Sequence, residues 1–179
     1  MIRYGYSPRV AYGVVGGGDG MGPMEAVVKA INEAELNATL VAICGRNEAL
    51  QERLRALPWT MPHHIYGFTS QMPEFMAASD MLVTKAGPGT ISEGFIAGLP
   101  LVIYSRLPGQ EDGNVQYVVD QKAGVWAPRP HQVVEAVRRW VNGATFEGGQ
   151  PKTDPVSGKT FWEHDVFFDT RNEPDTISP

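Results

Sequence analysis

Cysteine, positive charge and long apolar runs are all scarce in this sequence. The single cysteine, Cys44, excludes a disulfide framework and any multi-cysteine metal site, and it is typical of a reducing compartment. The 15 Lys and Arg residues against 20 Asp and Glu give a net charge of -5, which argues against nucleic-acid binding through phosphates. No apolar run approaches the ~18 residues of a membrane span, and residues 1–10 lack the apolar segment of a secretory signal. We therefore expect a soluble, intracellular protein.

The remaining composition indicates one folded domain followed by an acidic tail. The 179 residues are 42% hydrophobic, which is enough for one core. Residues 143–179 hold 3 Lys and Arg against 7 Asp and Glu, a net of -4, which leaves only -1 for residues 1–142. This segment is rich in proline and glycine and has no clear helical or strand period. We predict a linker at 1–9, a domain at 10–142 and a tail at 143–179.

Short apolar runs alternate with amphipathic segments along the predicted domain. The apolar runs predict strands at 11–15, 39–44, 65–68, 81–84, 101–104 and 124–127. Apolar residues at helical spacing predict helices near 24–31, 50–57, 72–78, 90–97, 115–121 and 133–141. Strands that alternate with helices form right-handed βαβ units. The fold class predicted is therefore α/β, a Rossmann-like parallel sheet with helices on both faces.

Two glycine-rich loops follow predicted strands. The first, GGGDGMG at 16–22, allows a ligand to approach the backbone, and the next helix offers free N–H groups to an anion. Its glycines fit the dinucleotide fingerprint in no register, and no P-loop Lys-Ser/Thr pair follows. The alternative is an ordinary tight turn. The second loop, KAGPGT at 85–90, repeats the arrangement, and two such loops facing one crevice suit a diphosphate.

Glu93 and a third loop supply candidate polar contacts. Glu93 stands three residues after Thr90, so the pair forms either a capping box or a ligand contact in which Glu93 binds a hydroxyl pair. The third loop, PGQEDGN at 108–114, offers groups that bind sugar hydroxyls, and its alternative is a solvated loop with an Asp-Gly turn. These groups are the side chains of Gln110, Glu111 and Asn114.

Other chemistry finds little support in the sequence. The four histidines show no metal-ligand spacing with one another or with Cys44, so no metal site is predicted. Neither a Gly-x-Ser-x-Gly nucleophile motif nor an Asp-x-Asp metal motif is present. Cys44 falls in a predicted buried strand and is interpreted as a core residue.

Several segments, in order from about Val14 to Val125, closely resemble the monogalactosyldiacylglycerol synthase family. The matching segments are GGGDGMGP at 16–23, ICGRN at 43–47, YGFTSQM at 66–72, TKAGPGTISE at 84–93, PGQEDGN at 108–114 and YVVD at 117–120. Related lipid-linked N-acetylglucosaminyltransferases share the layout without the KAGPGT and PGQE segments. The resemblance implies a GT-B glycosyltransferase, of which this chain is the carboxyl-terminal, donor-binding lobe.

The resemblance also implies a role for each site residue. Galactose from UDP-galactose would pass to diacylglycerol with inversion, and helix N-termini would stabilise the departing diphosphate without a cofactor or metal. Backbone at Phe68 would read the uracil, Glu93 the ribose hydroxyls, and Gln110 and Glu111 the sugar. The diphosphate would be held by Gly16, Gly17, Gly18, Asp19, Gly20, Gly87, Pro88, Gly89 and Thr90.

In this family a preceding lobe supplies the general base and the surface for the lipid acceptor. Residues 1–13 offer no substitute, so no catalytic residue is predicted here, and we expect a fragment or one subunit of a split enzyme. Such a chain would be cytosolic or peripheral at a membrane surface. UDP-glucose remains an alternative donor. Two further alternatives are an NADP-binding oxidoreductase domain, in which Arg46 meets the 2′-phosphate, and a non-catalytic binding module.

Overall fold

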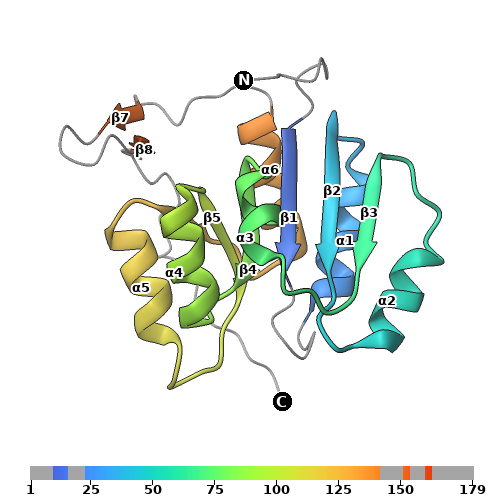
Figure 1. Ribbon diagram of the computed structural model, residues 1–179, viewed down its shortest axis with the longest axis horizontal. Helices are drawn as coiled ribbons and strands as arrows, with labels where there is room; N and C mark the ends of the chain where they lie inside the picture. Colours follow the sequence, from blue (N-terminus) through green and yellow to red (C-terminus); the bar gives the residue numbers. More distant parts are fainter. Residues whose placement is uncertain (1–9, 16–22, 142–150, 154–159, 163–179) are drawn as a thin grey trace.

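The computed structural model describes residues 10–15, 23–141, 151–153 and 160–162, and its main body is a six-stranded parallel sheet (Figure 1). The strand order is β3-β2-β1-β4-β5-β6, and each neighbouring pair is parallel. The strands are β1 (Val10–Val15), β2 (Ala38–Ile43), β3 (His63–Tyr66), β4 (Met81–Lys85), β5 (Leu101–Ser105) and β6 (Gly124–Trp126). This arrangement confirms the predicted parallel α/β fold.

Helices cover both faces of the sheet. They are α1 (Met24–Glu33), α2 (Glu48–Arg55), α3 (Met72–Ala77), α4 (Pro88–Ala97), α5 (Asp112–Asp120) and α6 (Pro130–Val141). In Figure 1, α3, α4 and α5 lie on the near side of the sheet, whereas α1 and α6 lie behind it. Each layer has its own apolar cluster: α1, α2 and α6 contribute to one, and α3, α4 and α5 to the other.

Strand β4 is buried on both faces because helices cover both sides of a parallel sheet. Along β4, Met81 and Val83 belong to the cluster beneath α1 and α6, and Leu82 belongs to the cluster beneath α3, α4 and α5. All three side chains are at most 1% exposed. This explains why β4 appears in the sequence as a continuous apolar run rather than an alternating one.

Strand order reverses at the centre of the sheet, which places the loops relevant to binding. The chain winds outward from β1 to β2 and β3, and then crosses back so that β4 pairs with the other side of β1. The carboxyl ends of β1 and β4 are therefore neighbours. In doubly wound sheets this reversal point is where ligands bind. The arrowheads of β1, β2 and β3 mark the same edge at the bottom of Figure 1.

Several element boundaries differ from the sequence prediction, and those of β3 and α4 bear most on the binding edge. Strand β3 runs over His63–Tyr66 instead of 65–68, because its ladder with β2 extends from His63 opposite Leu40 to Tyr66 opposite Ile43. As an edge strand it alternates between half-buried and exposed side chains. A continuous apolar run, on which the prediction relied, therefore does not mark its bounds. Helix α4 begins at Pro88, two residues before the predicted start.

A second, two-stranded sheet lies in the predicted tail. Strands β7 (Pro151–Thr153) and β8 (Thr160–Trp162) pair antiparallel. The sequence showed no strand period there because three residues are too few to establish one. In the described parts of the chain, no helix is both long and apolar enough to cross a membrane.

Candidate functional site

The candidate site lies along the carboxyl edge of the main sheet, where the loops from parallel strands converge. The glycine-rich loop after β1, with the predicted contacts Gly16, Gly17, Gly18, Asp19 and Gly20, lies outside the described residues. The described part of this edge consists of the loops after β2, β3, β4, β5 and β6. Two pairs of them contact each other through side chains, one pair on each side of β1.

The loop after β4 leads into the N-terminus of α4, which no side chain in the described part of the chain caps. Gly87 is the N-cap residue, Pro88 takes the first helical position, and the Ile91 amide donates to the Gly87 carbonyl at 3.0 Å. Proline suits this position because its ring presets the helical φ and the missing N–H would have no partner there. The remaining free amides of the first turn, on Gly89 and Thr90, point out of the helix and have no side-chain acceptor among residues 23–141.

The glycines of this loop are not required by the fold. A Cβ placed on Gly87 or Gly89 would meet nothing within 4 Å, and Gly87 has φ -66 and ψ 130, which any residue adopts. Elsewhere glycine has a packing reason: a Cβ on Gly94 would lie 2.8 Å from Leu101, and one on Gly124 only 2.2 Å from the Leu101 carbonyl oxygen. Open space beside Gly87 and Gly89 is what a ligand close to the backbone needs.

Of the two alternatives for Thr90 and Glu93, the capping box is wrong. Because α4 begins at Pro88, Thr90 is the third helical residue and cannot be the N-cap. Glu93 lies a full turn further along, and its exposed side chain makes no hydrogen bond or ion pair with any described residue. With the capping box excluded, contact with a ligand is the remaining alternative for Glu93. The prediction failed because Pro88 is itself a good first residue, which moves the helix start upstream of Thr90.

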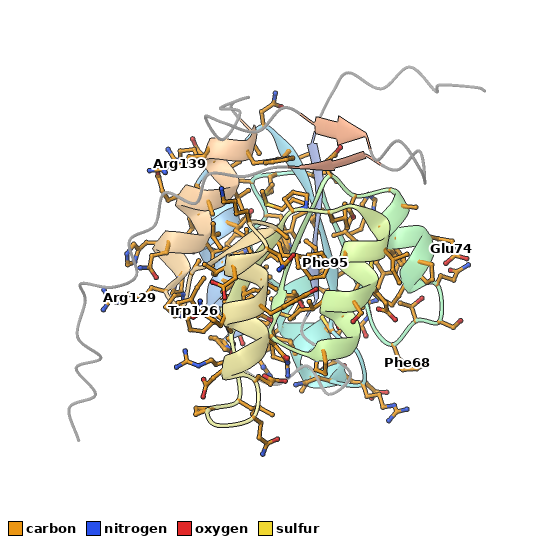
Figure 2. All side chains as sticks on the ribbon, turned by 90° about the vertical axis from the view of Figure 1, so that its left-hand side faces the viewer. Phe68, Glu74, Phe95, Trp126, Arg129 and Arg139 are labelled. Carbon is orange, nitrogen blue, oxygen red and sulfur yellow. The ribbon has the colours of Figure 1, made fainter. Side chains whose placement is uncertain are left out.

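On the other side of β1, the loops after β2 and β3 contact through Arg46 and Phe68. The Arg46 guanidinium carbon lies 5.0 Å from the centre of the Phe68 ring, which is a cation–π contact. The ring is 64% exposed and stands out from its loop in Figure 2. With its amide oxygen facing Gly67, Gln51 of α2 accepts from the Gly67 amide at 2.9 Å and thereby holds the backbone next to Phe68. Sequence reasoning missed this contact, because nothing local links Gln51 to a loop after β3.

The loop after β5 is shaped by its own carboxylates. Glu111 accepts from the Leu107 amide at 2.7 Å, and Asp112 accepts from the Gly109 amide at 2.8 Å and pairs with Arg106. The Gly109 amide and the Arg106 guanidinium hold the pKa of Asp112 below its usual range. Gln110 lies exposed at the tip of this turn; its backbone amide donates to the Leu107 carbonyl at 3.1 Å, and its side chain forms no hydrogen bond with a described residue. The loop is thus an ordered turn that presents Gln110, and Glu111 serves partly to build it.

Asn114 joins this loop to the one after β4. Its side-chain N–H donates to the Ala86 carbonyl oxygen at 2.8 Å, although the two residues are 28 positions apart. The sequence had placed Asn114 among the side chains suited to binding sugar hydroxyls. The structure instead gives its amide nitrogen an internal partner.

The remaining chemically active side chains belong to the core or to stacking pairs. Cys44 is fully buried, and burial raises the pKa of its thiol to about 11, so it is not a thiolate at neutral pH. The His63 ring stacks on Trp59 at 4.0 Å between ring centres. No group of three His, Cys, Asp or Glu side chains within the described ranges could hold a metal ion.

A doubly wound α/β domain with an uncapped, glycine-lined helix at its reversal point belongs to the class of nucleotide-binding folds. Residues 13–152 match the model of the glycosyltransferase family 28 C-terminal domain, and the chain belongs to this family. It is 46% identical over 134 residues to a probable monogalactosyldiacylglycerol synthase 3 of Oryza sativa subsp. japonica, an overlap of 71% of this chain and 26% of that protein. These findings confirm the resemblance seen in the motifs.

Other relatives extend the comparison. Monogalactosyldiacylglycerol synthase 2 of Arabidopsis thaliana is 37% identical over 172 residues, which cover 92% of this chain and 36% of that protein. The chain thus spans about a quarter to a third of the length of these relatives. Among solved structures, MurG of Acinetobacter baumannii aligns with a TM-score of 0.62 at 20% identity, over 73% of this chain and 41% of that one. The glycosyltransferase SnogD of Streptomyces nogalater aligns with a TM-score of 0.61 at 19% identity. The alignment covers 78% of this chain and 37% of that one. The fold is therefore the Rossmann-like lobe of a GT-B glycosyltransferase.

Proposed function

We propose that this chain is the donor-binding lobe of a glycosyltransferase that uses a UDP-sugar, with UDP-galactose as the donor and diacylglycerol as the acceptor. The observation that carries the proposal is the start of α4, where Gly87 and Gly89 leave open space beside backbone amides that no side chain of the described residues caps. Glycine in a first turn costs helix stability unless something else requires it. A diphosphate at this helix end supplies that requirement, because N–H groups and the helix dipole both favour an anion there.

The rest of the donor would lie along the carboxyl edge of the sheet. The loop after β1, residues 16–20, would also hold the diphosphate. The uracil would meet the backbone at Phe68, which Gln51 steadies through Gly67. Glu93 would accept hydrogen bonds from the ribose hydroxyls, and Gln110 at the tip of its turn, with Glu111 behind it, would contact the sugar.

The transfer itself would be an inverting displacement at the anomeric carbon by an acceptor hydroxyl. The departing UDP carries the developing negative charge, and backbone amides at helix N-termini would stabilise it without a metal or other cofactor. The general base and the lipid-binding surface would come from another part of the protein or from a partner chain. Relatives that carry the name monogalactosyldiacylglycerol synthase support galactose and diacylglycerol as the substrates, and one structural neighbour was solved as a complex with thymidine diphosphate.

Calorimetric titration of the purified chain with UDP, UDP-galactose, UDP-glucose and NADPH tests the proposal. We expect UDP and UDP-galactose to bind and NADPH not to bind, and the two UDP-sugars rank the galactose and glucose alternatives. Glu93→Gln should weaken UDP binding about tenfold, the effect of losing one charged hydrogen bond to a hydroxyl. Glu74→Gln, an exposed carboxylate on α3, is the matched control. No measurable UDP binding, or equal affinity in Glu93→Gln and wild type, would contradict this assignment.

A further inference from the structure

The side chain of Asn114 connects two parts of the candidate site that come from different strands. Asn114 lies in the first turn of α5, after the loop that presents Gln110, and its amide nitrogen donates to the Ala86 carbonyl oxygen at 2.8 Å. Ala86 is the residue between β4 and the N-cap of α4. One hydrogen bond therefore links the loop proposed for the sugar to the helix end proposed for the diphosphate.

Ala86 is held from both sides, which makes its carbonyl a fixed point. Its amide donates to the Ser105 carbonyl oxygen at 2.8 Å, and its side chain is fully buried. The ladder between β4 and β5 shifts its register at Thr84 and Lys85, so regular sheet pairing ends just before Ala86. The hydrogen bond from Asn114 then restrains the next peptide group, the one that joins Ala86 to Gly87.

The peptide between Ala86 and Gly87 determines where the first turn of α4 begins. Gly87 has no packed side chain and no cap partner, and open space surrounds it. The Gly87 carbonyl accepts from the Ile91 amide at 3.0 Å on the helix side of this residue. On its other side, the constraint on the peptide is the Ala86 carbonyl anchored by Asn114. A small rotation here would redirect the free amides of Gly89 and Thr90.

We infer that Asn114 is a positioning residue: it sets the direction of the α4 amides that receive the donor diphosphate, and it does so by donating a hydrogen bond to Ala86. This inference rests on the proposed function. It assigns Asn114 to the diphosphate through Ala86 rather than to the sugar directly, as its place in the polar loop would suggest. A side chain at this position must donate a hydrogen bond, so aspartate, which has the same shape, cannot replace it.

Titration of the full chain and its variants with UDP and with UDP-galactose separates these roles. Asn114→Ala and Asn114→Asp should both bind UDP about five- to tenfold more weakly, the effect of losing one hydrogen bond, and UDP-galactose should weaken by the same factor. Gln116→Ala and Gln116→Glu are matched controls, because Gln116 is an exposed amide on the same helix that bonds only Asp120 among described residues. Both controls should bind UDP as the wild type does. Circular dichroism below the melting temperature confirms that each variant is folded.

Two results would overturn the inference while leaving the proposed function intact. Unchanged UDP affinity with weaker UDP-galactose binding would make Asn114 a direct sugar contact. Wild-type affinity for both ligands in Asn114→Asp would show that the donated hydrogen bond is not needed. If the wild-type chain binds no UDP at all, the proposed function fails first and the inference fails with it.

Discussion

At the scale of single residues, the most informative positions are glycines that the fold does not need. Gly94 and Gly124 have neighbours so close that any side chain would force a shift, and they are explained by packing alone. Gly87 and Gly89 have open space beside them, so packing does not require glycine there, and the proposed diphosphate supplies a reason for it. The contrast with Gly94 and Gly124 is why we interpret the glycines of the loop after β4 as part of a ligand site.

Gly89→Ala should therefore have opposite effects on stability and binding. Alanine in the first turn of α4 should stabilise the fold by about 0.5–1 kcal/mol, because glycine loses more conformational entropy in a helix. The new methyl group should occupy the space proposed for the diphosphate and weaken UDP binding at least about tenfold. Urea unfolding and calorimetry measure the two effects.

Gly113→Ala provides the control for Gly89→Ala. Gly113 also lies in the first turn of a helix with open space around it, so the gain in stability should be similar, and UDP affinity should stay unchanged. An alanine at Gly89 that stabilises the fold and leaves UDP affinity intact would argue against a diphosphate at this helix end.

At the scale of elements, long-range side-chain bonds hold the helices against the loops. Asn32 at the end of α1 is only 5% exposed, and its amide donates to the Pro58 carbonyl at 3.0 Å and accepts from the Thr60 amide at 2.9 Å. The Thr60 hydroxyl also donates to the Asn32 carbonyl at 2.8 Å. These bonds fasten α1 to the segment that leads into β3, on the side of the sheet away from the candidate site's uncapped helix.

Asn32→Ala should destabilise the fold by about 1–3 kcal/mol, because it removes the two hydrogen bonds that its side chain makes with the backbone of Pro58 and Thr60. The affinity for UDP should not change, since Asn32 belongs to no part of the candidate site. Asn37→Ala, at an exposed asparagine in the next loop, should change stability by less than about 0.5 kcal/mol. Urea denaturation of the three proteins tests this expectation, and a loss as small in Asn32→Ala as in the control would contradict it.

Elements with a clear local pattern were the ones that sequence could place. The stripe Val133, Val137 and Val141 predicted α6, and the apolar run of β4 predicted a buried central strand. The start of α4 and the bounds of β3 were placed wrongly, because both depend on neighbours. Pro88 competes with Thr90 for the helix start, and β3 takes its bounds from its ladder with β2.

At the scale of the whole molecule, the distribution of charge indicates how the domain would bind a diphosphate. Of the net charge of -5, -4 lies in residues 143–179, so the predicted domain at 10–142 is near neutral. A nearly neutral domain that binds a diphosphate must do so through local backbone amides and helix dipoles rather than through its overall field. The candidate site is built in that way on its described side.

The chain by itself should bind UDP but transfer no galactose. It spans 26% to 36% of the length of its plant relatives, and no side chain of the described residues has been assigned as the general base. Incubation with UDP-galactose and diacylglycerol, followed by lipid chromatography, should yield no galactolipid. A full-length monogalactosyldiacylglycerol synthase in the same assay is the positive control. Galactolipid formed by this chain alone would contradict the expectation and place a base within it.

The sequence alone determined the α/β class, the alternation of elements and the loops to examine, because periodicity and glycine placement are local properties. Only the tertiary structure decided which loops meet. Asn114 reaches Ala86, Arg46 lies over Phe68, and Gln51 holds Gly67, each across strands that pairing brings together. It also decided that Thr90 is inside α4 and that Gly87 and Gly89 face open space. Contacts between residues far apart in sequence arise from strand order and packing, which no local pattern encodes.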